Sequence, residues 1–234
     1  MKMDTQSVNT AVIPVPKLEE DSYDWWERHE QVLNEQVKIN PEVVLIGDSI
    51  THFWGGEPKT EGNAGAVESW NSVFGPYRVL NLGFGWDRTQ NVLWRLDHGQ
   101  LKGLSPKTVV ILIGTNNTSD TDNARSNSPD EIVEGCRAIC DRVNNLVPDA
   151  KIILMAVFPR EEYPDHPRRR EITEINARYA ELARERHYEF LDISALLLEA
   201  DGILSAETAP DFCHLTERGY RRWADALSPL LPLR

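Results

Sequence analysis

The stretch LNLGFGWDRTQNVLWRL, residues 80–96, passes from an apolar run through a Gly-x-Gly turn into a helical pattern. A strand, a turn and a helix in this order form the repeating unit of a parallel α/β sheet. The same order is typical of dinucleotide-binding loops, so the turn raises the question of a bound phosphate. A tryptophan, Trp86, follows its second glycine, Gly85.

Apolar runs on both sides of this unit repeat the pattern. The run VVLIG, residues 43–47, is apolar throughout, as expected of a strand buried on both faces of a parallel sheet. Further strands are predicted at 77–83, 108–114, 151–158 and 188–193. Helices are predicted after them at 89–98, 128–146, 167–187 and 216–230. This alternation predicts an α/β fold with a single doubly wound parallel sheet of about five strands.

No repeat and no Gly/Ser-rich linker divides the body of the chain. Residues 1–22 are polar and irregular and are predicted to form an arm, and residues 23–234 a single domain. A helix is expected over 24–37, with Trp25 and Trp26 packing it onto the body. Ligands of such sheets bind beyond the carboxyl ends of the strands, so the residues that follow the strands are the functional candidates.

The net charge of −12 argues against a nucleic-acid surface, because such a surface needs a basic patch. The one dense basic run, Arg168 to Arg170, is interpreted as a solvated helix face. No apolar stretch reaches the roughly 18 residues of a membrane-spanning helix, and the N-terminus has no signal-peptide core. Since a cleaved signal would leave the same sequence, a cytoplasmic and a secreted location both stay open.

The cysteines predict neither a disulfide scaffold nor a metal site. Cys136 and Cys140 lie four residues apart on one face of a helical pattern, where packed thiols are expected. A zinc site would need a second pair of ligands at metal spacing, and the sequence has none. We therefore expect no bound metal.

A serine stands directly after the strand 43–47. In Gly47-Asp48-Ser49 the serine begins a helix, which places its hydroxyl at the mouth of the sheet and its N–H at the positive end of the helix dipole. A simple N-cap serine is the alternative. The motif differs from the Gly-x-Ser-x-Gly elbow of α/β-hydrolases, because Thr51 stands where that motif has its last glycine.

Near the C-terminus, Asp211 and His214 are three residues apart in one turn before the last helix. A carboxylate so placed can orient an imidazole, and histidine suits the base that a serine nucleophile needs because it titrates near neutral pH. The remaining histidines lack an acidic residue placed in this way and are interpreted as surface or packing residues: His29, His52, His98, His166 and His187. Of these, His52 is the strongest rival, because it closely follows Ser49.

The strand 108–114 ends in the sequence Gly114-Thr115-Asn116-Asn117. A side-chain amide at this rim of the sheet can donate a hydrogen bond to a developing oxyanion. The loss of one such donor costs roughly 2.7–4 kcal/mol of transition-state stabilisation. The alternative is that Asn116 and Asn117 only form the turn.

Four blocks in order carry a family resemblance: GDS after the first strand, NxGxG after the second, GTNN after the third and DxxH before the last helix. From about Val43 to the C-terminus the sequence resembles the SGNH (GDSL-type) serine hydrolases, and within them the platelet-activating-factor acetylhydrolase Ib catalytic subunits. The stretches that carry the resemblance are VVLIGDSI, LNLGFGWDRTQNVLWRLDHGQL, VVILIGTNN, AKIILMAVFPR and FCHLTERGY.

The resemblance implies a flavodoxin-like three-layer fold and hydrolysis of short-chain acyl esters, often acetyl, through an acyl-enzyme and without a cofactor. It implies Ser49 as nucleophile, His214 as base and Asp211 as the residue that orients His214. It also implies an oxyanion hole made by the Ser49 N–H, the Asn116 side chain and a backbone N–H of the turn after the second strand. That last donor belongs to a glycine in the family, and Trp86 stands at its position.

Trp86 is the one departure from the four blocks. A main-chain donor needs glycine only where φ is positive, and we expect Gly83 and Gly85 to take any such angle. The oxyanion hole is then intact, and the Trp86 ring shapes the wall of the pocket.

Further residues near the blocks are candidates for the substrate pocket. These are Asp48, Trp54, Gly85, Arg88 and Arg160. Trp54, like Trp70 and Trp86, offers a flat face to a sugar ring or else packs in the core, and the two arginines would contact an anionic substrate or are plain surface charges. The expected substrates are carbohydrate or other small-molecule esters, with a platelet-activating-factor-like phospholipid as the alternative. Related subunits dimerise, so a homodimer is also an open expectation.

Two other classes of function stay in view. A nucleotide-binding oxidoreductase would need a third glycine in the turn, where Arg88 stands instead. A non-catalytic binding module on the same fold would have Trp86 filling the pocket, but the chain retains Ser49, Asn116, Asp211 and His214.

Overall fold

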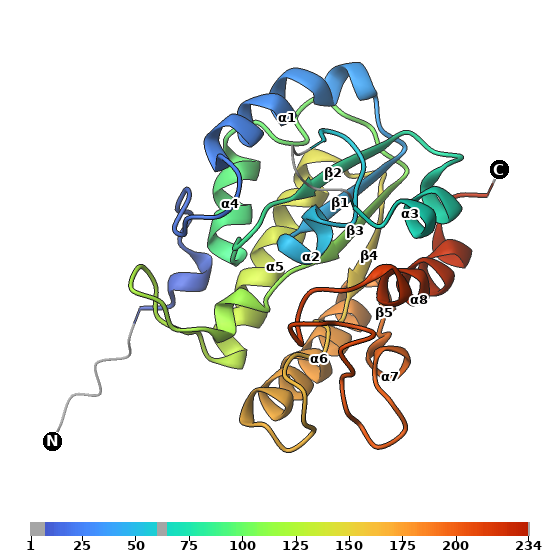
Figure 1. Cartoon of the computed structure of the whole chain (residues 1–234). Helices are drawn as coiled ribbons and strands as arrows, with labels where there is room; N and C mark the ends of the chain where they lie inside the picture. Colours follow the sequence, from blue (N-terminus) through green and yellow to red (C-terminus); the bar gives the residue numbers. More distant parts are fainter. Residues whose placement is uncertain (1–7, 60–64, 234) are drawn as a thin grey trace, which may run out of the picture.

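The computed structural model of the protein describes residues 8–59 and 65–233 (Figure 1). In this part of the chain, parallel strands form one sheet in the order β2-β1-β3-β4-β5. The strands are β1 (Val43–Gly47), β2 (Val79–Gly83), β3 (Thr108–Leu112), β4 (Lys151–Met155) and β5 (Glu189–Leu191). The central position of β1 and β3 puts the residues that follow them in the middle of one edge of the sheet.

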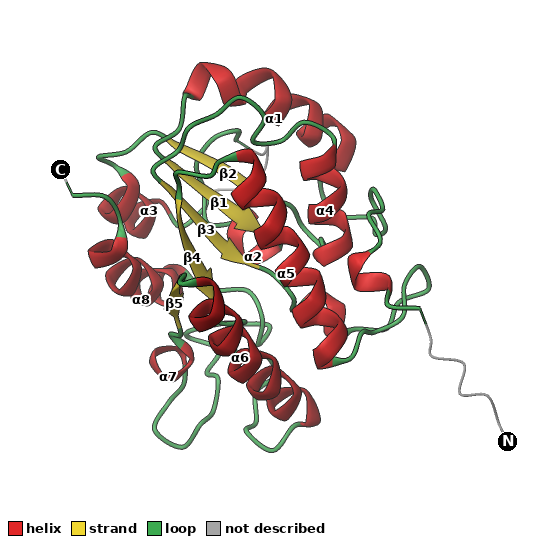
Figure 2. Cartoon of the chain, turned by 180° about the vertical axis from the view of Figure 1, so that it is seen from behind, coloured by secondary structure: helices red, strands yellow, loops and turns green. Residues whose placement is uncertain are grey.

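Helices cover both faces of the sheet, and Figure 2 shows α5 and α6 crossing in front of the strands. One layer holds α1 (Trp25–Ile39), α4 (Thr89–Asp97), α5 (Pro129–Leu146) and α6 (Pro167–Arg186). The other holds α2 (Ser49–His52), α3 (Val67–Phe74), α7 (Ser194–Leu197) and α8 (Glu217–Leu227). Single 3₁₀ turns are η1 (Thr10–Val12), η2 (Asn116–Thr118) and η3 (Ser228–Leu230).

Alternate residues of the strands pack against the two helical layers. In β1, Val44 and Ile46 join the core on the α1 side, and Val43 and Leu45 join the core on the α8 side. A strand covered on both faces favours apolar residues throughout, which explains the uninterrupted apolar run of β1. The predicted three-layer fold with one doubly wound parallel sheet is confirmed.

Residues 8–22 lie against the body of the protein. The turn η1 packs on α4 and α5. Thr89 Oγ1 donates a hydrogen bond to the Ala11 carbonyl over 2.8 Å, and Asn91 Nδ2 donates to the Pro16 carbonyl over 2.6 Å. Side chains at the start of α4 therefore anchor this segment.

The element boundaries differ from the predicted ones in a few places. The predicted strand 151–158 already ends at Met155, and the helix α3 was not predicted at all. Its N-cap position is Ala66, whose side chain cannot accept a hydrogen bond, so the sequence carries no start signal there. Of the two tryptophans expected to pack α1 onto the body, Trp25 is buried and Trp26 is 46% exposed.

Candidate active site

Ser49 lies where β1 passes into α2. Asp48 is the N-cap of this short helix, and its carboxylate accepts the Ile50 N–H over 3.0 Å. Glycine is needed at position 47, because a Cβ there would lie 2.1 Å from Thr51 Oγ1. Ser49 is thereby held at the carboxyl end of a central strand, and within the described residues its backbone N–H has no hydrogen-bond acceptor.

His214 reaches Ser49 from the loop before α8. Its Nε2 lies 2.8 Å from Ser49 Oγ, and its Nδ1 lies 2.6 Å from Asp211 Oδ2. The other carboxylate oxygen of Asp211 accepts the backbone N–H of His214 over 2.7 Å and that of Cys213 over 3.1 Å. One carboxylate therefore fixes both the ring and the backbone of His214. With its hydrogen on Nδ1, the ring can accept the Ser49 proton at Nε2.

A neighbouring loop braces this turn. Phe212 has a left-handed φ of 58°, and its carbonyl accepts the Glu161 N–H over 2.9 Å. Arg168 contacts the Glu161 carboxylate, and Arg169 Nη1 donates to the Glu161 carbonyl over 3.1 Å. The interpretation of the basic run as a solvated face is therefore wrong for these two arginines, which hold the loop that supports Phe212.

Two carboxyl groups near Ser49 have pKa values shifted in opposite directions. Partial burial raises the pKa of Asp211, but the hydrogen bonds from His214 outweigh it, so the pKa lies below its ordinary value of 3.8. Asp48 is buried, and loss of hydration raises its pKa to about 7 against the opposing effects of the Ile50 N–H and of His214. At neutral pH, Asp211 is ionised and Asp48 is partly protonated.

Trp86 occupies the third position of a tight turn after β2. The Asp87 N–H donates to the Phe84 carbonyl over 3.2 Å, and Trp86 has a φ of 63°. A positive φ at this position is the mark of a type II turn and favours glycine. The expectation that Gly83 and Gly85 take the left-handed angle is wrong, since neither of them has a positive φ. The strained backbone angle lies at Trp86 itself. Trp86 as a whole residue is 38% exposed.

The glycines of the turn are needed for close approach. A Cβ on Gly83 would lie 2.2 Å from the backbone nitrogen of His52, and one on Gly85 would lie 1.9 Å from Asp21 Oδ2. The Tyr23 hydroxyl donates to the Gly85 carbonyl over 3.2 Å, and the Gly85 N–H donates to His52 Nδ1 over 3.3 Å. Gly85 was predicted to line the substrate pocket. The space beside its Cα is instead filled by Asp21 and Tyr23 of the N-terminal segment.

Asn116 lies beside this turn. Its Nδ2 donates to the Asp87 carbonyl over 3.0 Å. A side-chain amide carries two hydrogens, so one of them is left for another acceptor. The loops after β2 and β3 are thus joined, and the Asn116 amide is held one residue away from Trp86.

The N-terminus of α4 is closed by asparagine side chains. Asn117 Oδ1 accepts the Thr89 N–H over 3.0 Å, and Asn91 Oδ1 accepts the Arg88 N–H over 2.8 Å. A phosphate-binding loop would leave such N–H groups open to its ligand. The turn after β2 therefore lacks the free helix N-terminus that a nucleotide-binding site needs.

A buried ion pair lies below the Trp86 turn. Asp87 accepts Trp25 Nε1 over 2.8 Å and Arg95 Nε over 2.7 Å, and the side chains of the pair are 2% and 0% exposed. Burial raises the pKa of Asp87 to about 6, against the effects of Arg95 and Trp25. The Phe84 ring packs under two guanidinium groups, 4.0 Å from that of Arg95 and 5.0 Å from that of Arg28. Helices α1 and α4 together support the turn.

Two predicted pocket residues belong to the protein interior. Arg88 is fully buried, and its guanidinium donates to the carbonyls of Arg125 and Ser119, each over 2.9 Å. Trp54 is also fully buried, and its ring stacks on Trp223 at 4.2 Å between centroids. Both side chains are therefore held inside the protein, Arg88 by a loop and Trp54 by the core, and Trp54 also lines a cavity beside β2.

Arg160 stays near the proposed site. Its Nη1 donates to Ser119 Oγ over 3.2 Å, and its positive charge lowers the pKa values of Asp48 and Cys213 against the larger effect of burial. It is the pocket candidate whose charge lies beside the residues that flank Ser49 and His214.

His52 does not compete with His214 as a base. It is 2% exposed, and burial together with Arg28 and Arg95 lowers its pKa to about 2. Its Nδ1 is used to hold Gly85. The other histidines pack or cap helices, as interpreted from the sequence: His29 is buried, His98 stacks on Trp94, and His166 and His187 cap α6.

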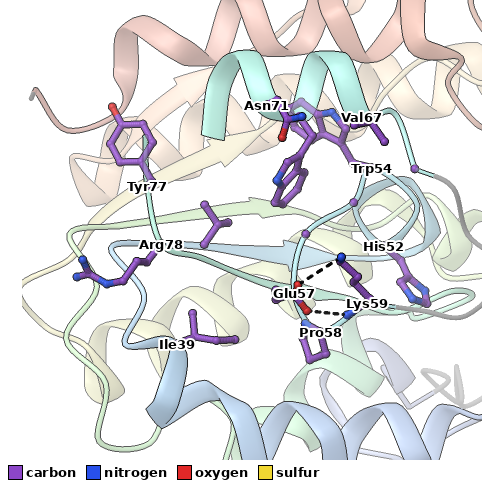
Figure 3. Close-up of a pocket in the computed structure, with 15 residues that line it drawn as sticks. Ile39, His52, Trp54, Glu57, Pro58, Lys59, Val67, Asn71, Tyr77 and Arg78 are labelled. Carbon is purple, nitrogen blue, oxygen red and sulfur yellow. Dashed lines mark hydrogen bonds and ion pairs between the residues drawn. The ribbon is translucent and has the colours of Figure 1, made fainter. Parts of the chain in front are cut away.

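A cavity of about 620 Å³ lies alongside β2, and Figure 3 shows the residues that line it. It runs from Tyr77 and Arg78, before that strand, to Trp70 and His52. Its described lining contains none of the residues that carry the Ser49–His214 contact. The cavity therefore lies apart from the Ser49–His214 contact.

The described residues, 8–59 and 65–233, contain neither a candidate metal-ion cluster nor a candidate membrane span. There, no three His, Cys, Asp or Glu side chains are grouped so that they could hold a metal ion. No helix in that part of the chain is long and apolar enough to cross a membrane. Cys136 and Cys140 are buried as free thiols.

Comparison with known proteins supports one family. The sequence model of the GDSL-like lipase/acylhydrolase family matches residues 45–222. Platelet-activating factor acetylhydrolase IB subunit alpha1 of Rattus norvegicus is 34% identical over 208 residues, which cover 88% of this chain and 82% of the relative. Subunit alpha2 from the same organism is 31% identical over 88% of this chain and 83% of its own length.

Solved structures support the same fold. A GDSL-like lipase from Bacteroides thetaiotaomicron superposes with a TM-score of 0.69 at 20% identity, covering 87% of this chain and 96% of that one. An acetylxylan esterase from Geobacillus stearothermophilus superposes with a TM-score of 0.65 at 22% identity, covering 83% and 95%. The family resemblance read from the sequence is confirmed, and the chain belongs to the GDSL-like lipase/acylhydrolase family of carboxylic ester hydrolases.

Proposed function

We propose that this chain is a serine esterase that removes short acyl groups, acetyl foremost, from carbohydrate or other small-molecule esters. The observation that carries the proposal is the continuous series from Ser49 Oγ through the His214 ring to the Asp211 carboxylate, with separations of 2.8 and 2.6 Å. A hydroxyl, an imidazole and a carboxylate in this order are the parts of a nucleophilic acyl-transfer site.

The proposed reaction has two halves. Ser49 Oγ attacks the ester carbonyl while its proton passes to His214 Nε2, and collapse of the tetrahedral intermediate releases the alcohol, which takes that proton. Water then attacks the acyl group on Ser49 with His214 again as base, which frees the acid. Asp211 stays ionised and holds the imidazolium that forms in each half.

Three donors are proposed for the oxyanion: the N–H of Ser49, the N–H of Trp86 and the remaining amide hydrogen of Asn116. In support, the Ser49 N–H lacks an acceptor in the described structure, as does the Trp86 N–H. The Asn116 amide is tied to the carbonyl of the residue after Trp86. Donors fixed in advance stabilise developing charge without reorganising.

The choice of acyl group draws on the relatives, whose names contain an acetylhydrolase and an acetylxylan esterase. The test is a ladder of chromogenic 4-nitrophenyl esters with acetyl, butyryl and octanoyl groups, assayed with the native chain and Ser49→Ala. We expect the highest kcat/KM for acetate and no turnover above background in the variant. A preference for octanoate would refute the short-chain assignment, and undiminished turnover by Ser49→Ala would refute the esterase site.

The alcohol part of the ester is tested separately. Acetate release is compared between an acetylated xylooligosaccharide and a short-chain phospholipid that carries one acetyl ester. The proposal expects faster release from the carbohydrate. Faster release from the phospholipid would overturn the carbohydrate assignment and leave the acyl chemistry intact.

A further inference from the structure

We propose that Tyr23 is a positioning residue of the oxyanion hole, and that its hydroxyl holds the Gly85–Trp86 peptide in the orientation that presents the Trp86 N–H to the substrate. This inference rests on the proposed esterase function. The match to the family model begins at residue 45, and Tyr23 lies before it. The inference therefore adds a residue from outside the matched segment to the site.

One peptide group links Tyr23 to the proposed oxyanion hole. The Tyr23 hydroxyl donates to the Gly85 carbonyl over 3.2 Å, and this carbonyl belongs to the same peptide as the Trp86 N–H. The peptide is trans, since Glu57–Pro58 is the only cis bond in the described chain. The C=O and N–H of a trans peptide point in opposite directions. A hydrogen bond on the carbonyl therefore fixes the direction of the N–H, away from Tyr23.

This peptide has a second available orientation. Type I and type II turns differ by a flip of the central peptide, and only type II needs a positive φ at the third residue. Trp86 has a φ of 63°, a left-handed angle that strains a non-glycine residue. A flip would relieve this strain and withdraw the Trp86 N–H. Tyr23 opposes the flip, because its hydrogen bond exists only while the Gly85 carbonyl faces it.

Neighbouring side chains fix the position of Tyr23 relative to the turn. The Tyr23 and His52 rings form a T-shaped pair, 4.5 Å between centroids with an interplanar angle of 78°. His52 Nδ1 in turn accepts the Gly85 N–H over 3.3 Å. Burial raises the pKa of the Tyr23 hydroxyl well above its usual value, so the group stays a donor across the working pH range. The peptide before Gly85 and the one after it are thus both held.

The brace by Tyr23 also accounts for a tryptophan where the resemblance to the family implies a glycine. Glycine adopts the left-handed angle freely and needs no brace. Trp86 needs one, and Tyr23 supplies it. The effect of removing the hydroxyl should therefore depend on which residue stands at position 86.

The experiment is a double-mutant cycle on 4-nitrophenyl acetate hydrolysis. Tyr23→Phe is made in the native background and in Trp86→Gly, and kcat and KM are measured for each. We expect Tyr23→Phe to lower kcat about 10-fold in the native background with KM within about 2-fold, because a misdirected donor loses part of the 10²–10³-fold that one oxyanion donor supplies. In the Trp86→Gly background the same change should lower kcat by less than about 3-fold.

Tyr77→Phe is the matched control. It removes a tyrosine hydroxyl that donates to a backbone carbonyl, that of Pro232, over 2.8 Å at the opposite end of β2. We expect its kcat to equal that of the native chain. A general loss of packing would instead lower activity in both tyrosine variants or in both backgrounds.

The outcomes separate this inference from the function on which it rests. An unchanged kcat in Tyr23→Phe, or an equal loss in both backgrounds, overturns the role of Tyr23 while Ser49-dependent turnover by the native chain stands. A native chain without Ser49-dependent turnover overturns the esterase proposal, and the inference falls with it.

Discussion

Ser49 Oγ and His214 Nε2 lie 2.8 Å apart although 165 positions separate them in the chain. The contact follows from the fold, because β1 delivers Ser49 to the sheet edge and the loop before α8 passes over the same edge. The Tyr220 hydroxyl of α8 donates to the Ile50 carbonyl of α2 over 2.7 Å. This buried bond ties the helix after His214 to the helix that Ser49 begins.

Asp211→Asn should lower kcat about 10- to 10³-fold with little change in KM. The amide keeps the shape of the side chain but cannot stabilise the imidazolium of His214 as a charge does. A buried aspartate in this role is worth about 10⁴-fold. We expect less here because the Asp211 side chain is 54% exposed, and water screens its charge. Asp225→Asn on the exposed face of α8 serves as control, and equal kinetics of the two variants would contradict the orienting role.

Substitutions of Trp86 separate its ring from its backbone. Trp86→Ala and Trp86→Gly both remove the ring, but only glycine relieves the φ of 63°. We expect the glycine variant to be more stable than the alanine variant by about 1 kcal/mol in urea unfolding. Hydrolysis of 4-nitrophenyl acetate should fall less than about 10-fold in either variant, because both keep the backbone N–H that is proposed as an oxyanion donor. Collapse of turnover in both would mean that the ring, and not the N–H, is what catalysis needs.

Arg95→Met should destabilise the protein by about 3–5 kcal/mol, because it leaves the buried Asp87 carboxylate without its charged partner. The pair is 2.7 Å apart, with side chains 0% and 2% exposed. Arg142→Met breaks an ion pair of the same 2.7 Å separation with Asp97, at 30% and 39% exposure. This control should cost less than about 1 kcal/mol. Urea unfolding measures both, and similar losses would refute the importance of the buried pair.

Asp48→Asn should change the pH dependence of stability. The pKa of Asp48 is raised from 3.8 to about 7 in the folded chain, so the folded state binds the proton more tightly than the unfolded state. This group therefore stabilises the fold below about pH 4 and loses that contribution as the pH rises through about 7. Removing it should flatten the decline in unfolding free energy between these values by up to about 1.4 kcal/mol per pH unit. Asparagine keeps an N-cap oxygen, so parallel curves for the two proteins would contradict the raised pKa.

Much of the fold could be predicted because its strands are buried on both faces. Runs such as VVLIG are apolar on both faces of the strand, and the helices between them carry start signals such as Ser128, Pro129 and Glu131. Helix α3 was missed because Ala66 gives no such signal. The order of the four blocks then placed Ser49, Asn116, Asp211 and His214 at one edge of the sheet.

Burial and backbone angle were the properties that the sequence could not supply. Arg88 resembles a surface charge in the sequence, but it lies inside the protein because the carbonyls of a loop satisfy its guanidinium. From the sequence, Trp54 could equally be an exposed aromatic platform or a core residue, and in the structure it is buried in the core. The positive φ lies at Trp86, and Gly85 is needed instead for the close approach of Asp21 and Tyr23. Each case depends on tertiary contacts between distant segments.

The central claim is that Ser49 carries the acyl group during turnover. Rapid mixing of the native chain with 4-nitrophenyl acetate, followed by acid quenching and peptide mass mapping, tests it directly. We expect one acetyl group on the peptide that contains Ser49, its decay at the rate of steady-state turnover, and no label in Ser49→Ala. Hydrolysis without a labelled Ser49 peptide, or a label that persists in Ser49→Ala, would contradict the account.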